Sequence, residues 1–139
     1  MKKILINLVC FLLIFCCMNT PASAAEHNEI FPRANNFSST FTDFTINNNG
    51  TATVVVKYMG IDGVTSGAKI TVKIQKRFLL VFWNDVDGAS WVDNASGVYY
   101  SNSHSISVKS GYYRAQVEYT IYGSGGAADV VTEQIEAEN

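Results

Sequence analysis

The sequence is poor in the residues that support covalent and metal chemistry. Its three cysteines, Cys10, Cys16 and Cys17, lie close to the N-terminus, and the whole chain has only two histidines, His27 and His104. Removal of the N-terminal segment would leave a chain without any disulfide, thiol nucleophile or thiolate metal site. The shortage of cysteine and histidine also disfavours a zinc site.

The only long uncharged apolar run lies at the N-terminus and is typical of an export leader. Lys2 and Lys3 precede a run of 15 residues at 4–18, and small residues occupy positions 22–24. A signal peptidase reads such small residues, and a membrane-spanning helix needs a longer run of about 20 residues. We therefore expect a signal peptide at 1–24, cleavage before Ala25, and a secreted, extracellular chain without a membrane span.

Basic residues are a minority and form no stripe. The chain expected after cleavage has 115 residues, with eight Lys and Arg against twelve Asp and Glu. This balance argues against nucleic acid and against anionic lipid as partners, because both attract basic patches. The length is typical of one domain that can bury a core without disulfides.

What the sequence does contain is apolar and polar residues in alternation. Over residues 68–75 apolar side chains alternate with Lys, Thr and Gln, and the same pattern recurs at 104–108 and 113–122. Alternation with a period of two predicts strands with one wet face. Further strands are expected at 41–46, 53–59 and 129–135. Turn clusters that contain Gly, Asn or Ser separate them at 47–50, 60–67, 110–111 and 123–126.

These segments predict an all-β fold, an antiparallel β-sandwich of about seven short strands. The stretch SGYYRA at 110–115 resembles the Gly-x-Tyr-x-Cys segment of immunoglobulin-like domains, with Ala115 in place of the cysteine. The resemblance implies an immunoglobulin-like architecture without a disulfide, in which the Tyr113 hydroxyl bonds to nearby backbone. We assign 1–24 to the signal peptide, 25–38 to an N-terminal extension and 39–139 to the sandwich.

A second resemblance covers most of the expected mature chain. The stretches NNNGTATV at 47–54 and ITVKIQKR at 70–77, the Trp83 and Trp91 pair, and the segment 107–135 are similar to a loose group of short secreted all-β proteins of spore-forming Gram-positive bacteria. That group has no assigned activity. The resemblance therefore implies export and an all-β fold, and it implies no catalytic residue.

The stretch RFLLVFWNDVDGASW at 77–91 is unusual because it contains six apolar residues in a row. An unbroken strand from Lys69 to Trp83 would span about 50 Å, so a bend or turn is expected near residues 76–77. Beyond it, one face would hold Phe78, Leu80 and Phe82 towards the core, and the other Leu79, Val81 and Trp83. Either the segment 30–41 covers that second face, or it is an exposed binding surface.

The aromatic residues in and after this stretch are the candidate ligand-binding residues. Flat rings stack on sugars, which points to Trp83, Trp91, Tyr99 and Tyr100. Of the two tryptophans, we expect Trp83 to be the more packed and Trp91, on the polar GASWVDN stretch, to be the more exposed.

The aspartates of the same stretch are the candidate metal ligands. Asp85, Asp87 and Asp93 could hold calcium in an irregular loop, although turn formation is the favoured explanation for aspartates there. An EF-hand alignment fails, because Trp83 and Asn94 would occupy its first and twelfth positions.

No pattern in the chain predicts catalysis or a cofactor. His104 has serine neighbours, but adjacent strand residues point to opposite faces, so neither serine can use it as a base. The glycine-rich segment 123–128 lacks the lysine and the helix of a phosphate-binding loop. We expect a non-catalytic binding or adhesion module for a cell-wall glycan, a host glycan or a surface protein. The alternatives are a small structural or self-associating exported protein and, third, a glycan-active enzyme.

Overall fold

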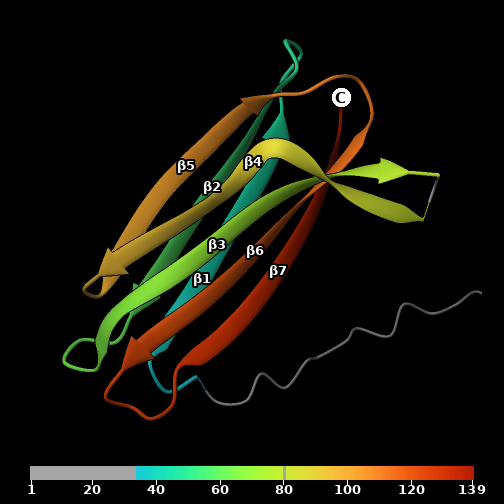
Figure 1. Ribbon diagram of the computed structural model, residues 1–139. Helices are drawn as coiled ribbons and strands as arrows, with labels where there is room; N and C mark the ends of the chain where they lie inside the picture. Colours follow the sequence, from blue (N-terminus) through green and yellow to red (C-terminus); the bar gives the residue numbers. More distant parts are fainter. Residues whose placement is uncertain (1–33, 80) are drawn as a thin grey trace, which may run out of the picture. The chain divides into compact units, whose positions relative to one another are not determined.

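The computed structural model describes residues 34–79 and 81–139, which form seven antiparallel strands in two sheets (Figure 1). One sheet has the order β1-β2-β5 and the other β4-β3-β6-β7. The all-β sandwich of seven strands predicted from the alternation is confirmed. The strands are β1 (Phe37–Ile46), β2 (Thr51–Gly60), β3 (Thr65–Phe78), β4 (Phe82–Ser96), β5 (Tyr99–Ser107), β6 (Tyr112–Gly123) and β7 (Asp129–Glu138).

The start of β6 has the tyrosine that SGYYRA predicted. Tyr113 is buried, and its hydroxyl donates to the carbonyl of Lys109 at 2.7 Å, which confirms the expected backbone bond. In constant-type immunoglobulin domains the fourth strand pairs with the fifth, whereas β4 here pairs with β3. Closer kinship with immunoglobulin-like domains therefore stays a prediction.

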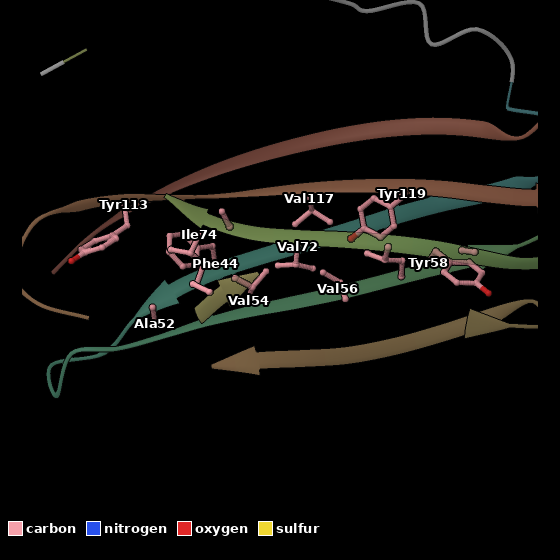
Figure 2. Packing of buried hydrophobic residues seen from close by; sticks show 14 of the residues in the cluster. Phe44, Ala52, Val54, Val56, Tyr58, Val72, Ile74, Tyr113, Val117 and Tyr119 are labelled. Carbon is pink, nitrogen blue, oxygen red and sulfur yellow. The ribbon is translucent and has the colours of Figure 1, made fainter. Parts of the chain in front are cut away.

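The hydrophobic core lies between the two sheets, and Figure 2 shows their side chains meeting there. The inward residues of β2, including Val54 and Val56, face those of β3 and β6, including Val72, Ile74 and Val117, and all are fully buried. Burial of each such side chain contributes about 1.5–3 kcal/mol relative to exposure. Within the described residues, the buried hydrophobic side chains belong to β1, β2, β3, β4 and β6.

The sandwich begins earlier than the boundary that we placed at residue 39. The carboxylate of Asp129 accepts hydrogen bonds from the backbone N–H groups of Asn35 and Asn36, at 3.0 and 2.7 Å. The Asn36 side chain is fully buried and donates to the carbonyl of Ala127 at 2.7 Å. Residues 35–38 therefore belong to the domain, and the expected signal peptide at 1–24 lies outside the described residues.

At one end of the sandwich β3 and β4 continue past their neighbours as a two-stranded arm (Figure 1). Strand β6 reaches β3 only as far as Lys76, which pairs with Tyr113, so the rest of β3 pairs with β4 alone. A bulge in β4 lies where the arm leaves the body, and Gly88 there has a φ of 74°. Bulges bend and twist strands, and glycine adopts a positive φ without a steric cost.

This arm corrects the path that we expected for the apolar run. The turn does not fall at residues 76–77, because β3 continues to Phe78 and joins β4 through residues 79–81. Phe78 and Phe82 point to the same side as the core residue Ile74, as predicted, yet they are 53% and 60% exposed. They do not reach the core because, among the described residues, the strands of the opposite sheet end before the arm. Leu80 lies outside the described residues.

Candidate functional site

The arm ends in exposed apolar side chains. Leu79 is 68% exposed and Val81 is 71% exposed, and the paired residues Phe78 and Phe82 are also more than half exposed. These four residues are termed the arm tip. The described part of the segment 30–41 does not cover them, because β1 lies along β2 in the other sheet. A contiguous exposed apolar patch on a small domain is typical of an interaction surface.

The backbone of the arm tip is strained at Leu79. Its φ is 47°, which makes it the one described non-glycine residue with a positive φ. A left-handed conformation costs a residue with a Cβ roughly 1–2 kcal/mol, and only Gly, Asn and Asp adopt it readily. Leu79 therefore occupies a position at which the backbone conformation favours Gly, Asn or Asp. Strain of this kind is found where a functional requirement outweighs local stability.

Two cation–aromatic pairs lie at the base of the arm tip. The guanidinium of Arg114 lies 4.5 Å from the ring centroid of Trp83, and that of Arg77 lies 4.0 Å from the centroid of Tyr112. Stacking of this type fixes the position of a guanidinium and leaves it charged. A hydrogen bond from Tyr112 to Glu138, together with the charge of that carboxylate, raises the pKa of Tyr112. The residues at the base of the arm tip are therefore both aromatic and charged.

A cleft of about 400 Å³ lies beneath the arm. Its arm side includes Lys76, Phe78 and Val86, and its other side includes Lys109 and Tyr113 from the end of the sandwich. The Lys76 ammonium lies 5.3 Å from the Tyr113 ring centroid and donates to the carbonyl of Ser110 at 3.0 Å. The cleft is therefore lined by apolar groups and by four charged side chains, those of Lys76, Arg77, Lys109 and Asp85.

The four predicted aromatic residues do not form one platform. Trp83 lies on the outer face of the four-stranded sheet beneath Arg114, whereas Trp91 packs against the core. Both tryptophans are partly buried, so the expected contrast between a packed Trp83 and a more exposed Trp91 stays a prediction. Trp91 packs against the core because GASWVDN is part of β4 and its alternation turns Trp91 inwards. Tyr100 also faces inwards and stacks on Tyr58, with centroids 6.3 Å apart, while Tyr99 is 58% exposed on the opposite face.

The three predicted aspartates also lie apart. Asp85 accepts a hydrogen bond from Gln75 at 2.6 Å and lies 3.9 Å from the Lys73 ammonium, both on the outer face. Asp87 is exposed in the bulge, and Asp93 points into the sandwich. The sequence suggested a loop, but a strand with a bulge separates the three carboxylates. Within residues 34–79 and 81–139 no cluster of three His, Cys, Asp or Glu side chains could hold a metal ion.

Asp93 belongs instead to a polar cluster between the edge strands β4 and β5, which the sequence analysis missed. Nε2 of His104 lies 2.9 Å from Oδ2 of Asp93, and the imidazole stacks on Trp91 with ring centroids 4.9 Å apart. The Asn102 amide donates to the same carboxylate oxygen at 3.2 Å. Burial, and then the charge of Asp93, raise the pKa of Tyr100. The alternation of residues 100, 102 and 104 shows that they share one face, but the sequence does not show that this face meets Asp93.

Comparison with known proteins assigns neither a family nor a function. No protein-family model, no curated protein and no solved structure matches the chain. In the part of the chain that the structure describes, no helix is both long and apolar enough to cross a membrane.

Proposed function

We propose that this chain is an exported, non-catalytic extracellular binding module that attaches to its partner through the arm tip. The observation that carries the proposal is the exposure of four apolar side chains, each between 53% and 71%, on one projecting hairpin. Water-exposed apolar groups that are contiguous rather than scattered indicate an interaction surface. The leader-like segment at 1–24 supports export.

The polar groups of the sandwich support binding rather than catalysis. The His104 ring is held between Trp91 and Asp93, and Ser103 and Ser105 lie on the exposed opposite face of β5. A general base must be within hydrogen-bond reach of the group that it activates. In this proposal the His104 and Asp93 pair fills the gap between two sheet edges and carries out no reaction.

Self-association is the second candidate function, and a different surface favours it. On the outer face of the three-stranded sheet, Phe41, Met59 and Tyr99 are 51%, 53% and 58% exposed. The ammonium of Lys57 lies 5.1 Å from the Phe41 ring centroid and interrupts this patch. The arm tip has no such charge among its four side chains, which favours it as the primary surface.

The proposed function is tested by attachment of the chain that begins at Ala25, which contains all seven described strands, to defined surfaces. Three proteins are compared: the wild type, Leu79→Asn at the arm tip, and Val130→Asn, which removes a side chain of similar exposure, 61%, at the far end of β7. The surfaces are a glycan array, purified peptidoglycan and phospholipid vesicles. We expect at least one surface to retain the wild type and the Val130→Asn variant but to lose Leu79→Asn.

Equal retention of the two variants on every surface would show that the arm tip is not the binding surface. The mass of each protein at micromolar concentration is measured in parallel by light scattering. A dimer that Tyr99→Ser abolishes and Leu79→Asn preserves would favour self-association through the outer-face patch instead.

A further inference from the structure

We propose that the partner of the arm tip is a phospholipid bilayer with anionic headgroups, into whose interface the tip inserts without spanning the membrane. This inference rests on the proposed function, because it names the partner of the same surface. Three features of the arm carry it: the order of residue types along its length, its local charge, and its shape.

The residue types along the arm follow the layers of a bilayer. The apolar arm tip comes first, and the next cross-strand pair back, Arg77 and Trp83, brings an aromatic ring and a cation. Arg114 over Trp83 and Arg77 over Tyr112 complete this level. Tryptophan and tyrosine favour the headgroup level of a membrane, and arginine and lysine favour the phosphates just outside it.

The length of the arm tip matches shallow insertion. Leu79 and Val81 each lie two positions beyond the Arg77 and Trp83 pair. At about 3.3 Å per residue, the end of the tip reaches roughly 7 Å past the aromatic level. Interfacial elements bury their apolar face about 5–10 Å into the boundary between headgroups and acyl chains. The tip is therefore long enough to anchor the protein and far too short to cross a bilayer.

The part of the arm next to its tip carries cations and no carboxylate, whereas farther back Asp85 borders the cleft and Glu138 lies beside Tyr112. Residues 76–84 contain Lys76 and Arg77 and no carboxylate, whereas the net charge of the chain is −2. Lys109 borders the same cleft as these two cations, and Arg114 covers Trp83. The nearest carboxylate on the arm, that of Asp85, is directed towards Lys73 and Gln75.

The acidic net charge of the chain led us to expect no binding to anionic lipid. The local group of cations changes that expectation. The sequence shows no basic stripe because Lys109 and Arg114 are far from Lys76 and Arg77 along the chain, and folding brings them to one end of the sandwich. A basic residue near an anionic leaflet contributes favourably within a Debye length, even when the rest of the protein is acidic.

The shape of the arm also favours a bilayer over a protein groove. Its exposed side chains project at the end of a hairpin on both sides of the turn, so a folded partner would need a deep pocket that surrounds them. A fluid bilayer accommodates such a projection without a matched cavity. Leu79, strained at a φ of 47°, is exposed at the turn, where only insertion into an apolar medium would bury it on all sides.

The test measures flotation with vesicles of phosphatidylcholine alone and of an equimolar mixture with phosphatidylglycerol, using the chain from Ala25. We expect the wild type to float with the mixed vesicles and Leu79→Asn to bind at least about tenfold more weakly, which is the effect of losing one buried leucine. Val130→Asn should bind as the wild type does. Arg77→Gln should weaken binding to the mixed vesicles roughly fivefold and leave binding to phosphatidylcholine alone nearly unchanged.

Fluorescence reports the depth of insertion separately. In a Trp91→Phe background the remaining Trp83 should shift its emission to the blue and become protected from iodide when mixed vesicles are added. If Trp91→Phe does not fold, the difference between the spectra of the wild type and of Trp83→Phe gives the same signal.

Equal flotation of Leu79→Asn and Val130→Asn, or no flotation of the wild type, would overturn the lipid inference. Arm-tip-dependent retention on glycans or peptidoglycan would then preserve the proposed function. Loss of arm-tip dependence on every surface would reject both.

Discussion

The hairpins β1–β2 and β3–β4 turn at the same end of the sandwich, but different types of residue form the two turns. In the first, the Asn47 side chain accepts hydrogen bonds from the N–H groups of Asn49 and Thr51 at 3.0 and 2.9 Å, and Gly50 adopts a φ of 73°. In the second, Leu79 has the positive φ, and the residues on either side of it in the sequence are apolar. Asn and Gly are the residues that such turns favour locally.

The two turns also differ in how they are connected to the body of the sandwich. The Asn47–Gly50 turn is also tied to the body, because the carbonyl of Gly50 accepts a hydrogen bond from the N–H of Val108 at 2.7 Å. The arm tip instead projects beyond the strands of the opposite sheet. A turn selected for stability alone would resemble the first, so the apolar arm tip indicates a requirement outside the fold.

The largest effect is expected for two residues on one face of β3. Ile74 is fully buried and Phe78, four positions later, is 53% exposed at the arm tip. Ile74→Ala should lower the free energy of unfolding by about 2–5 kcal/mol, because it removes a packed side chain and leaves a cavity. Phe78→Ala should change it by less than about 1 kcal/mol. Urea unfolding followed by circular dichroism measures both, and similar losses would contradict the exposed position of the tip.

The second prediction concerns the β1–β2 turn. Gly50→Ala should destabilise the protein by about 2 kcal/mol, because a Cβ is disfavoured at this φ. The new Cβ would also lie 2.7 Å from the carbonyl oxygen of Val108. Gly63→Ala is the matched control, since its φ is 72° and its Cβ would meet no atom within 4 Å. Thermal melts should show a larger loss of stability for Gly50→Ala than for Gly63→Ala. Equal losses would show that the backbone conformation alone, and not the contact with Val108, causes the destabilisation.

The third prediction is an alkaline transition of the body. Burial raises the pKa of Tyr119 from 10.0 to about 12. Because the folded pKa is the higher one, the stability contributed by the neutral hydroxyl is fully present below pH 10 and is lost as the pH rises towards 12. The loss is on the order of 2 kcal/mol.

The Tyr119→Phe variant isolates this transition. The Tyr119 hydroxyl lies 2.7 Å from that of Thr42 and donates to the carbonyl of Phe41 at 2.9 Å. Tyr119→Phe should therefore cost about 1 kcal/mol near neutral pH and flatten the decline of the melting temperature between pH 10 and 12. An unchanged alkaline decline in the variant would assign it to other groups.

The smallest effect on stability is expected at the arm tip itself. Leu79→Asn should leave the free energy of unfolding unchanged or raise it by up to about 1 kcal/mol, because asparagine tolerates the left-handed conformation. Leu79→Val, which keeps an apolar side chain but is β-branched, should lower it slightly. A large loss of stability in Leu79→Asn would show that the tip is packed in solution and would undo the contrast between the two turns.

Much of the fold was predictable because it depends on local alternation. The segments 68–75 and 113–122 keep a strict apolar and polar alternation, and both lie within strands whose inward residues form the core. The Tyr113 hydroxyl bond was implied by the resemblance of SGYYRA to immunoglobulin-like domains, and its acceptor lies only four residues away. The stretch from Asp85 to Asp93 was interpreted as a loop because its glycine and aspartates are typical of turns, whereas in the fold it belongs to a strand with a bulge.

The candidate site was predictable only in part. The stretch at 77–83 was identified as unusual from its sequence, but its exposure depends on where the strands of the opposite sheet end, and alternation carries no information about that. The separation of Trp83 from Trp91 depends on the bulge at Gly88 and on the alternation that follows it. The pairing of His104 with Asp93 depends on two edge strands from different sheets coming together.

The sequence by itself determined the all-β class, the single core and the apolar run, because strand alternation and hydrophobic burial depend on residue type and spacing. Tertiary structure alone decided that the run is an exposed arm tip and that Lys76, Arg77, Lys109 and Arg114 gather behind it. Whether an apolar side chain is buried depends on what lies opposite it, and that is set by the relative lengths and order of strands distant along the chain.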